Sequence, residues 1–150
     1  MKTMLKDYLN WEKLMTCSRC SGGHEDIMEN LFKDGEVIAS YIEDDYQGNE
    51  AYVYFLNGEY ILITDYFGSC SGCDAWEDAN DEEVRNLCIQ LANNAHRFDS
   101  IHTLMSFLEV DVEEDKATYY AEHSTSKQIL EELRKNLWAL RDYNINKLEE

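Results

Sequence analysis

The chain has 150 residues, with 31 Asp and Glu against 13 Lys and Arg, and a formal net charge of −18. This length and a hydrophobic content of 44% predict a single folded domain over residues 1–150 rather than a disordered acidic tail. The charge excludes nonspecific binding to nucleic acid or to an anionic membrane. The first sixteen residues lack the apolar core of a secretory signal, so we expect a cytoplasmic protein with reduced cysteines.

Two helices are predicted at the start of the chain. The first, over about residues 3–15, rests on four apolar residues at helical spacing, which are Met4, Tyr8, Trp11 and Met15. The second spans about residues 24–33, and Gly35 is expected to cap its C-terminal end.

The middle of the chain predicts a β-meander. Its expected strands are Val37–Ile42, Ala51–Leu56 and Glu59–Tyr66, with a polar turn over residues 44–50. Asn57-Gly58 separates the last two strands and favours a type I′ turn, which pairs Phe55 with Tyr60. The same register pairs Val53 with Leu62 and Ala51 with Thr64. Both faces of this hairpin are apolar, so both are covered or one meets a partner.

The sequence of the second half of the chain predicts mainly helices. Helices are expected from Asn80 to about His96, from a Ser100 cap through Leu108, and from Thr125 to about residue 147. The pattern of residues 111–123 is ambiguous, and Ala117–Ala121 is the candidate for a fourth strand. The last helix carries leucines at helical spacing, namely Leu130, Leu133, Leu137 and Leu140. These leucines either pack on the sheet of a monomer or form the contact between two chains of a homodimer. The predicted fold is α+β: a small antiparallel sheet of three or four strands with helices before and after it.

Four of the five cysteines form two Cys-x-x-Cys pairs, Cys17 with Cys20 and Cys70 with Cys73. Two such pairs can hold one zinc ion in a tetrahedral site, so zinc is a candidate cofactor, with His24 as a substitute ligand. The alternative is four reduced thiols in tight turns. His96, His102 and His123 are expected on or near helical faces, and Cys88 on an apolar helix face is expected in the core.

A redox or nucleophilic role for the second cysteine pair is disfavoured. Carboxylates surround that pair and raise a thiol's pKa; they are Asp65, Asp74, Glu77 and Asp78. A thiol- or metal-dependent enzyme therefore ranks behind a non-enzymatic protein.

The acidity is concentrated in residues 34–84, which hold fourteen Asp and Glu and no Lys or Arg. A second stretch without Lys or Arg, residues 98–115, holds six anions. Tyrosines are interleaved with the first block, as at a protein interface. The expected partner-binding residues are Asp44, Asp45, Tyr46, Tyr52, Tyr54, Asp65, Tyr66, Asp74, Glu77 and Asp78. The alternative is a solvated acidic face.

The run Tyr66-Phe-Gly-Ser-Cys-Ser-Gly-Cys-Asp74 resembles a motif of uncharacterised phage and bacterial proteins. The resemblance covers these nine residues and implies a phage or mobile-element origin, without an activity. With the acidic block, it suggests an inhibitor that occupies a basic nucleic-acid-binding surface of a host defence protein, as a nucleic-acid mimic. A zinc-stabilised structural or adaptor protein, with zinc held by the two cysteine pairs, is the alternative.

Overall fold

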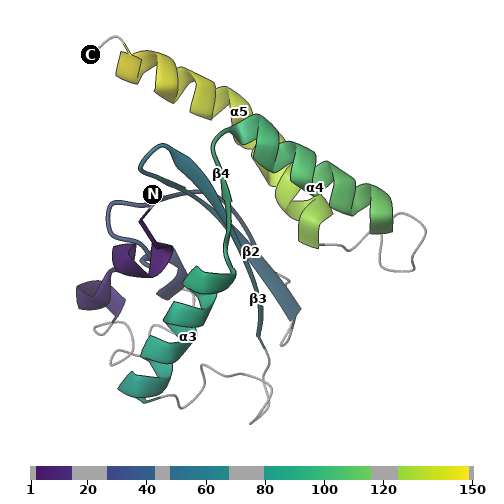
Figure 1. Cartoon of the computed structure of the whole chain (residues 1–150). Coiled ribbons are helices and arrows are strands. Elements are labelled where there is room, and N and C mark those ends of the chain that lie inside the picture. Colours follow the sequence, from purple (N-terminus) through teal and green to yellow (C-terminus); the bar gives the residue numbers. More distant parts are fainter. Residues whose placement is uncertain (1–2, 15–26, 43–47, 68–79, 116–124, 149–150) are drawn as a thin grey trace.

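The structure is a computed structural model that describes residues 3–14, 27–42, 48–67, 80–115 and 125–148. For residues 48, 66–67, 114–115 and 137–148 it describes the backbone alone. Figure 1 shows a central sheet with helical elements on both sides of it. The described helices include none that is both long and apolar enough to cross a membrane.

The sheet has four antiparallel strands in the order β1-β2-β3-β4. Their bounds are Glu36–Ile42 for β1, Gly48–Leu56 for β2, Glu59–Phe67 for β3 and His96–Phe98 for β4. Asn57 and Gly58 join β2 to β3 with φ angles of 50° and 80°, the left-handed values that a type I′ turn needs. All three predicted hairpin pairs are present, so the register and the α+β fold are confirmed.

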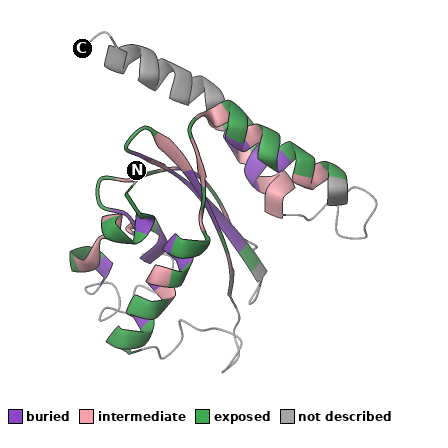
Figure 2. Ribbon diagram, viewed as in Figure 1, coloured by how far each residue is buried: buried purple, intermediate pink, exposed green. Residues whose placement is uncertain are grey.

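Both faces of the sheet are covered, as the apolar alternation of the hairpin indicates. The remaining elements are η1 (Leu5–Tyr8), α3 (Asp81–Asn94), α4 (Ile101–Asp115) and α5 (Thr125–Leu148). The first core, which includes Tyr54 and Cys88, lies between the sheet and the N-terminal elements with α3. The second core, which includes Val53 and Leu104, lies between the sheet and the α4–α5 pair. Figure 2 shows buried residues in the strands and on the helix faces turned toward them.

The prediction of one continuous helix over residues 3–15 is wrong. The 3₁₀ helix η1 ends at Tyr8, Leu9 forms a bridge with Phe32, and residues 11–14 are helical again. Backbone hydrogen bonds to the second predicted helix replace the helical ones: Asn10 N donates to Leu31 O over 2.9 Å. The expected apolar stripe shifts in consequence. Met4 is 54% exposed, while the buried residues are Leu5, Leu9 and Leu14.

The turn before β1 also differs from the prediction. Asp34, not Gly35, has the left-handed backbone, with a φ of 63°. Gly35 is needed for a close approach instead, because a Cβ at this position would lie 3.0 Å from the Cβ of Phe32. The helical residues 27–29 agree with the second predicted helix, of which residues 24–26 lie outside the described part of the chain.

The fourth strand is β4, directly after α3, and His96 therefore lies in a strand rather than on a helix. The Ala117–Ala121 segment expected to supply it lies outside the described residues. The helix predicted from Ser100 is confirmed and extends to Asp115, and the hydroxyl of Ser100 accepts a hydrogen bond from Thr103 N over 3.2 Å. The last predicted helix is α5, in which Leu130 and Leu133 are buried in the second core.

A β-bulge in β1 is held by a contact from α5. The pairing of β1 with β2 shifts between Val37 and Ala39, so Ile38 has no partner residue in the described β1–β2 register. The Asn136 side chain donates to the Ile38 carbonyl from Nδ2 over 3.1 Å, across 98 residues of sequence. This hydrogen bond fixes α5 to the edge of the sheet.

Replacing Asn136 by Ala removes the donor and leaves the Ile38 carbonyl partly buried without it. We expect the free energy of unfolding in urea to fall by about 1 kcal/mol. The neighbouring Lys135, 71% exposed and paired with Glu132, provides the control, and its change to Ala should cost less than about 0.5 kcal/mol. Equal effects of the two changes would contradict the role assigned to Asn136.

Candidate functional site

The register brings three strand ends, and with them two chain connections, to the same end of the sheet. Ile42, where β1 ends, pairs with Glu50, and Gly48, where β2 begins, pairs with Phe67, where β3 ends. We call this region, with Glu50 and Asp65, the acidic sheet end. The predicted partner-binding residues that connect to it but lie outside the described residues are Asp44, Asp45, Tyr46, Asp74, Glu77 and Asp78.

Glu50 and Asp65 are directly opposed on β2 and β3. Opposed residues of antiparallel strands project to the same face, so these two carboxylates lie on the face that carries the first core. Glu50 is fully buried, whereas Asp65 is half-buried. Asp65, a predicted binding residue, therefore has surface that a partner can contact. Glu50, which was not predicted as a binding residue, has none. The backbone of Tyr66 continues β3, and its side chain is among those not described.

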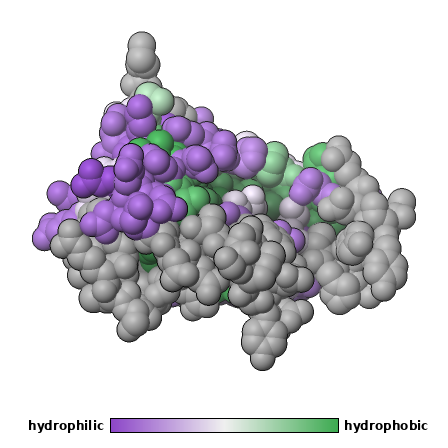
Figure 3. All heavy atoms as spheres, turned by 90° about the horizontal axis from the view of Figure 1, so that it is seen from below, coloured by the Kyte–Doolittle hydropathy of each residue, from purple (hydrophilic) through white to green (hydrophobic). Residues whose placement is uncertain are grey.

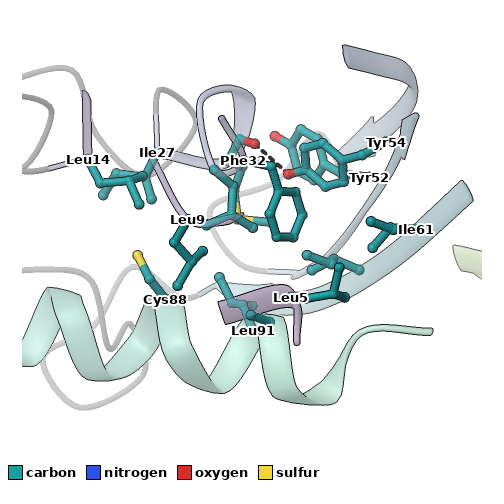
Figure 4. Close-up of a cluster of buried hydrophobic side chains, with 14 of the residues drawn as sticks. Leu5, Leu9, Leu14, Ile27, Phe32, Tyr52, Tyr54, Ile61, Cys88 and Leu91 are labelled. Carbon is teal, nitrogen blue, oxygen red and sulfur yellow. Dashed lines mark hydrogen bonds between the residues drawn. The ribbon is translucent and has the colours of Figure 1, made fainter. Parts of the chain in front are cut away.

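Tyr52 and Tyr54 are core residues, and their prediction as partner-binding residues is wrong. Each is 1% exposed, so neither can offer contact area to a partner. Their rings stack at a centroid distance of 6.2 Å, and Phe32 meets Tyr54 edge-on at 5.1 Å. The Tyr54 hydroxyl donates to the Met28 carbonyl (Figure 4).

Burial raises the pKa of Tyr54 well above its ordinary value, and the nearby Tyr52 and Glu50 raise it further. The Tyr54 side chain is therefore a neutral hydrogen-bond donor to the Met28 carbonyl. A sequence signal for this burial existed, because the two tyrosines alternate onto the same strand face as Leu56 and their cross-strand partners Ile61 and Ile63 are apolar.

The N-terminus of α3 adds exposed carboxylates to the molecule. Asn80 forms a reciprocal capping box with Glu83: its side chain accepts from Glu83 N over 2.8 Å, and its own N–H donates to the Glu83 carboxylate over 3.4 Å. Asp81, Glu82 and Glu83 are all exposed in the first turn, where the helix dipole favours negative charge. Seen from below, hydrophilic residues predominate on the side where α3 lies (Figure 3).

One anion of the block is neutralised by a cation from outside it. Arg97 on β4 donates from Nε and from one terminal nitrogen to the two carboxylate oxygens of Glu59, over 3.2 and 2.5 Å. Its other terminal nitrogen donates to the Thr3 carbonyl over 2.7 Å. Arg97 thus joins the N-terminal segment, β3 and β4, and removes Glu59 from any partner-binding surface. No local pattern could have indicated this contact, because 38 residues separate its partners.

The four paired cysteines lie outside the described residues, as does His24. Described residues on either side of the first of these segments, and in the helix after the second, belong to the first core. Residues 15–26 follow Leu14 and precede Ile27, and both of these residues are buried in that core (Figure 4). Residues 68–79 precede α3, which contributes Val84 and Cys88 to the same core. Within the described part of the chain, no group of three or more His, Cys, Asp or Glu is placed to hold a metal ion.

Cys88 is fully buried, which confirms its predicted place in the core. Burial raises the pKa of its thiol to about 12. At neutral pH the group is therefore protonated and unreactive, and it behaves as a small apolar side chain.

No protein-family model, curated protein or solved structure matches the chain. Its function is therefore argued from its own residues.

Proposed function

We propose that the protein is a non-enzymatic binding protein whose acidic sheet end engages a basic surface of a partner protein. The observation that carries the proposal is that residues 34–84 hold fourteen Asp and Glu and no Lys or Arg. The strand register supports it, because the segments with Asp44, Asp45, Asp74, Glu77 and Asp78 leave the sheet at one end. Carboxylates concentrated in this way steer a basic surface into contact and suppress other partners.

Nucleic-acid-binding proteins are the class in which a large basic surface is expected. We therefore infer that the partner is a nucleic-acid-binding protein and that this protein acts as an inhibitor by occupying the nucleic-acid site. The resemblance of residues 66–74 to phage and bacterial proteins supports an anti-defence role against a host protein.

The proposal is tested by neutralising Asp44, Asp45, Glu77 and Asp78 together, each to Asn or Gln. Immobilised wild-type protein is expected to retain its partner from a host lysate at low salt and to release it as the salt concentration rises, since exposed charges are screened. Added duplex nucleic acid should displace the partner from the immobilised protein, because the nucleic acid and this protein compete for the same basic surface of the partner. The quadruple variant should retain little of it.

A matched control neutralises Asp7, Glu12, Glu131 and Glu132, which lie outside residues 34–84. Its four substitutions change the net charge by the same amount as those of the quadruple variant. This control should behave as the wild type. Equal retention by all three proteins, or retention that salt does not weaken, would remove the proposal.

A second candidate is a zinc-stabilised adaptor, because described residues flanking the first cysteine pair and following the second belong to the same core. In that case Cys17, Cys20, Cys70 and Cys73 hold one zinc ion and tie the two segments together. Zinc then contributes directly to folding stability.

Metal analysis of the purified protein should then find one zinc per chain, and a chelator should lower the melting temperature. A thiol reagent should modify four cysteines after chelation, but not Cys88, which is buried and has a pKa of about 12. A Cys88→Ala control should keep the zinc, and a Cys17→Ser variant should lose it. Less than about half a zinc per chain rules the adaptor out.

A further inference from the structure

An apolar patch lies on the outer side of α4, next to the edge strand β4. Phe107 and Val110, one helical turn apart, are 38% and 59% exposed. Leu104 and Leu108 on the same helix are fully buried or nearly so in the second core. The apolar surface of α4 therefore extends beyond the residues that the second core buries.

Rings from β4 support this patch from beneath. The ring of Phe107 lies 4.9 Å from that of His96 and 5.3 Å from that of Phe98, measured between centroids. Phe98 packs against the second core, whereas His96 is exposed beside Phe107. The patch is therefore a fixed aromatic platform on the sheet edge, the kind of surface that anchors interfaces. We call His96, Phe107 and Val110 the α4 platform.

The surroundings of the α4 platform are negatively charged. Residues 98–115, which include all of α4, hold six anions and no Lys or Arg. Glu109 and Glu113 are exposed on α4 itself. Glu109 pairs with Arg134 of α5 at 3.3 Å, and both side chains of this pair are more than half exposed, so solvent screens it.

We propose that the α4 platform docks a basic amphipathic segment of a partner protein, with an apolar side chain of that segment on Phe107 and Val110 and its Lys or Arg facing the acidic rim. Charge complementarity decides between the occupants. A second copy of this chain would place two acidic rims and two chains of charge −18 against each other. A basic segment gains from the same rim, and the apolar contact gives it its position.

The inference shares with the proposed function the expectation of a basic protein partner, but it uses other residues. The α4 platform lies on the helical pair that covers the second core, whereas Glu50 and Asp65 of the acidic sheet end lie on the face of the first core. Each surface can therefore fail independently of the other.

The test uses two synthetic peptides of equal charge. One carries Lys and Leu at helical spacing, and the other has Ser in place of every Leu. Fluorescence anisotropy should show that wild-type protein binds the Leu-containing peptide at least about tenfold more tightly, because only that peptide buries apolar area on the platform. Amide NMR shifts should change in residues 96–98 and 103–113.

The F107S/V110S variant should lose this preference, reducing the ratio of the two affinities to about threefold or less. Val110→Lys alone, at an exposed position that tolerates change, should weaken binding of the Leu-containing peptide in the same direction. Met4→Ser, which changes an exposed apolar residue elsewhere, is the control and should bind as the wild type. Melting curves verify that each variant is folded.

Equal affinity of wild-type protein for both peptides, or an unchanged preference in F107S/V110S, overturns the inference. Binding that shifts only amides of residues 34–84 also overturns it, while leaving the proposed function intact. Conversely, the variant with Asp44, Asp45, Glu77 and Asp78 neutralised should still bind the Leu-containing peptide as tightly as the wild type. That result supports the inference even if capture of a partner through the acidic sheet end fails.

Discussion

The structure depends on one strand, β2, being buried on both faces at once. Tyr52 and Tyr54 project into the first core, and Ala51 and Val53 project into the second. The two sets differ in size: the first core receives two tyrosine rings from β2, whereas the buried β2 residues in the second core are Ala51 and Val53, with Phe55 packed against its margin. A shift of the register by one residue would exchange the two sets. The Asn57-Gly58 turn, with both φ angles positive, prevents that shift and so determines what each layer of helices meets.

The positions of the two proposed binding surfaces follow from the same constraint. Because β2 is central and antiparallel to both neighbours, the chain leaves β1 and β3 and enters β2 at one end, where Glu50 opposes Asp65. On the opposite face, β4 completes the sheet edge, and its rings support Phe107 of α4. The two proposals thus use different parts of one sheet: the first uses charge at its end, and the second uses an apolar anchor at its edge.

Much of this arrangement could be predicted from local sequence signals. The Asn57-Gly58 pair identified the hairpin and its register. Apolar spacing identified α3, the Ser100 cap identified α4, and a capping box with spaced leucines identified α5. Contacts between distant segments could not be predicted. The bridge from Leu9 to Phe32 breaks a helix that the local pattern favours, and β4 is too short to be recognised by its own three residues. Local propensity yields to tertiary hydrogen bonds at such positions.

The candidate site was predictable in part. The position of the charges was evident, since absence of Lys and Arg is a property of sequence alone. Their accessibility was not: Glu50 is buried, Glu59 is bound by Arg97, and Tyr52 and Tyr54 belong to the core. Tyrosine has an apolar ring and a polar hydroxyl, so its presence in an acidic block fits an interface and a core equally well until its strand partners are considered.

Native-state hydrogen exchange of the β2 amides tests whether both faces of this strand are enclosed. If β2 is enclosed by both cores, the amides of residues 51–56 should exchange among the slowest in the protein and only by global unfolding. The amides of α4, which covers one face only, should exchange faster. Exchange of the β2 amides at the rate of α4 would contradict a sheet buried on both faces.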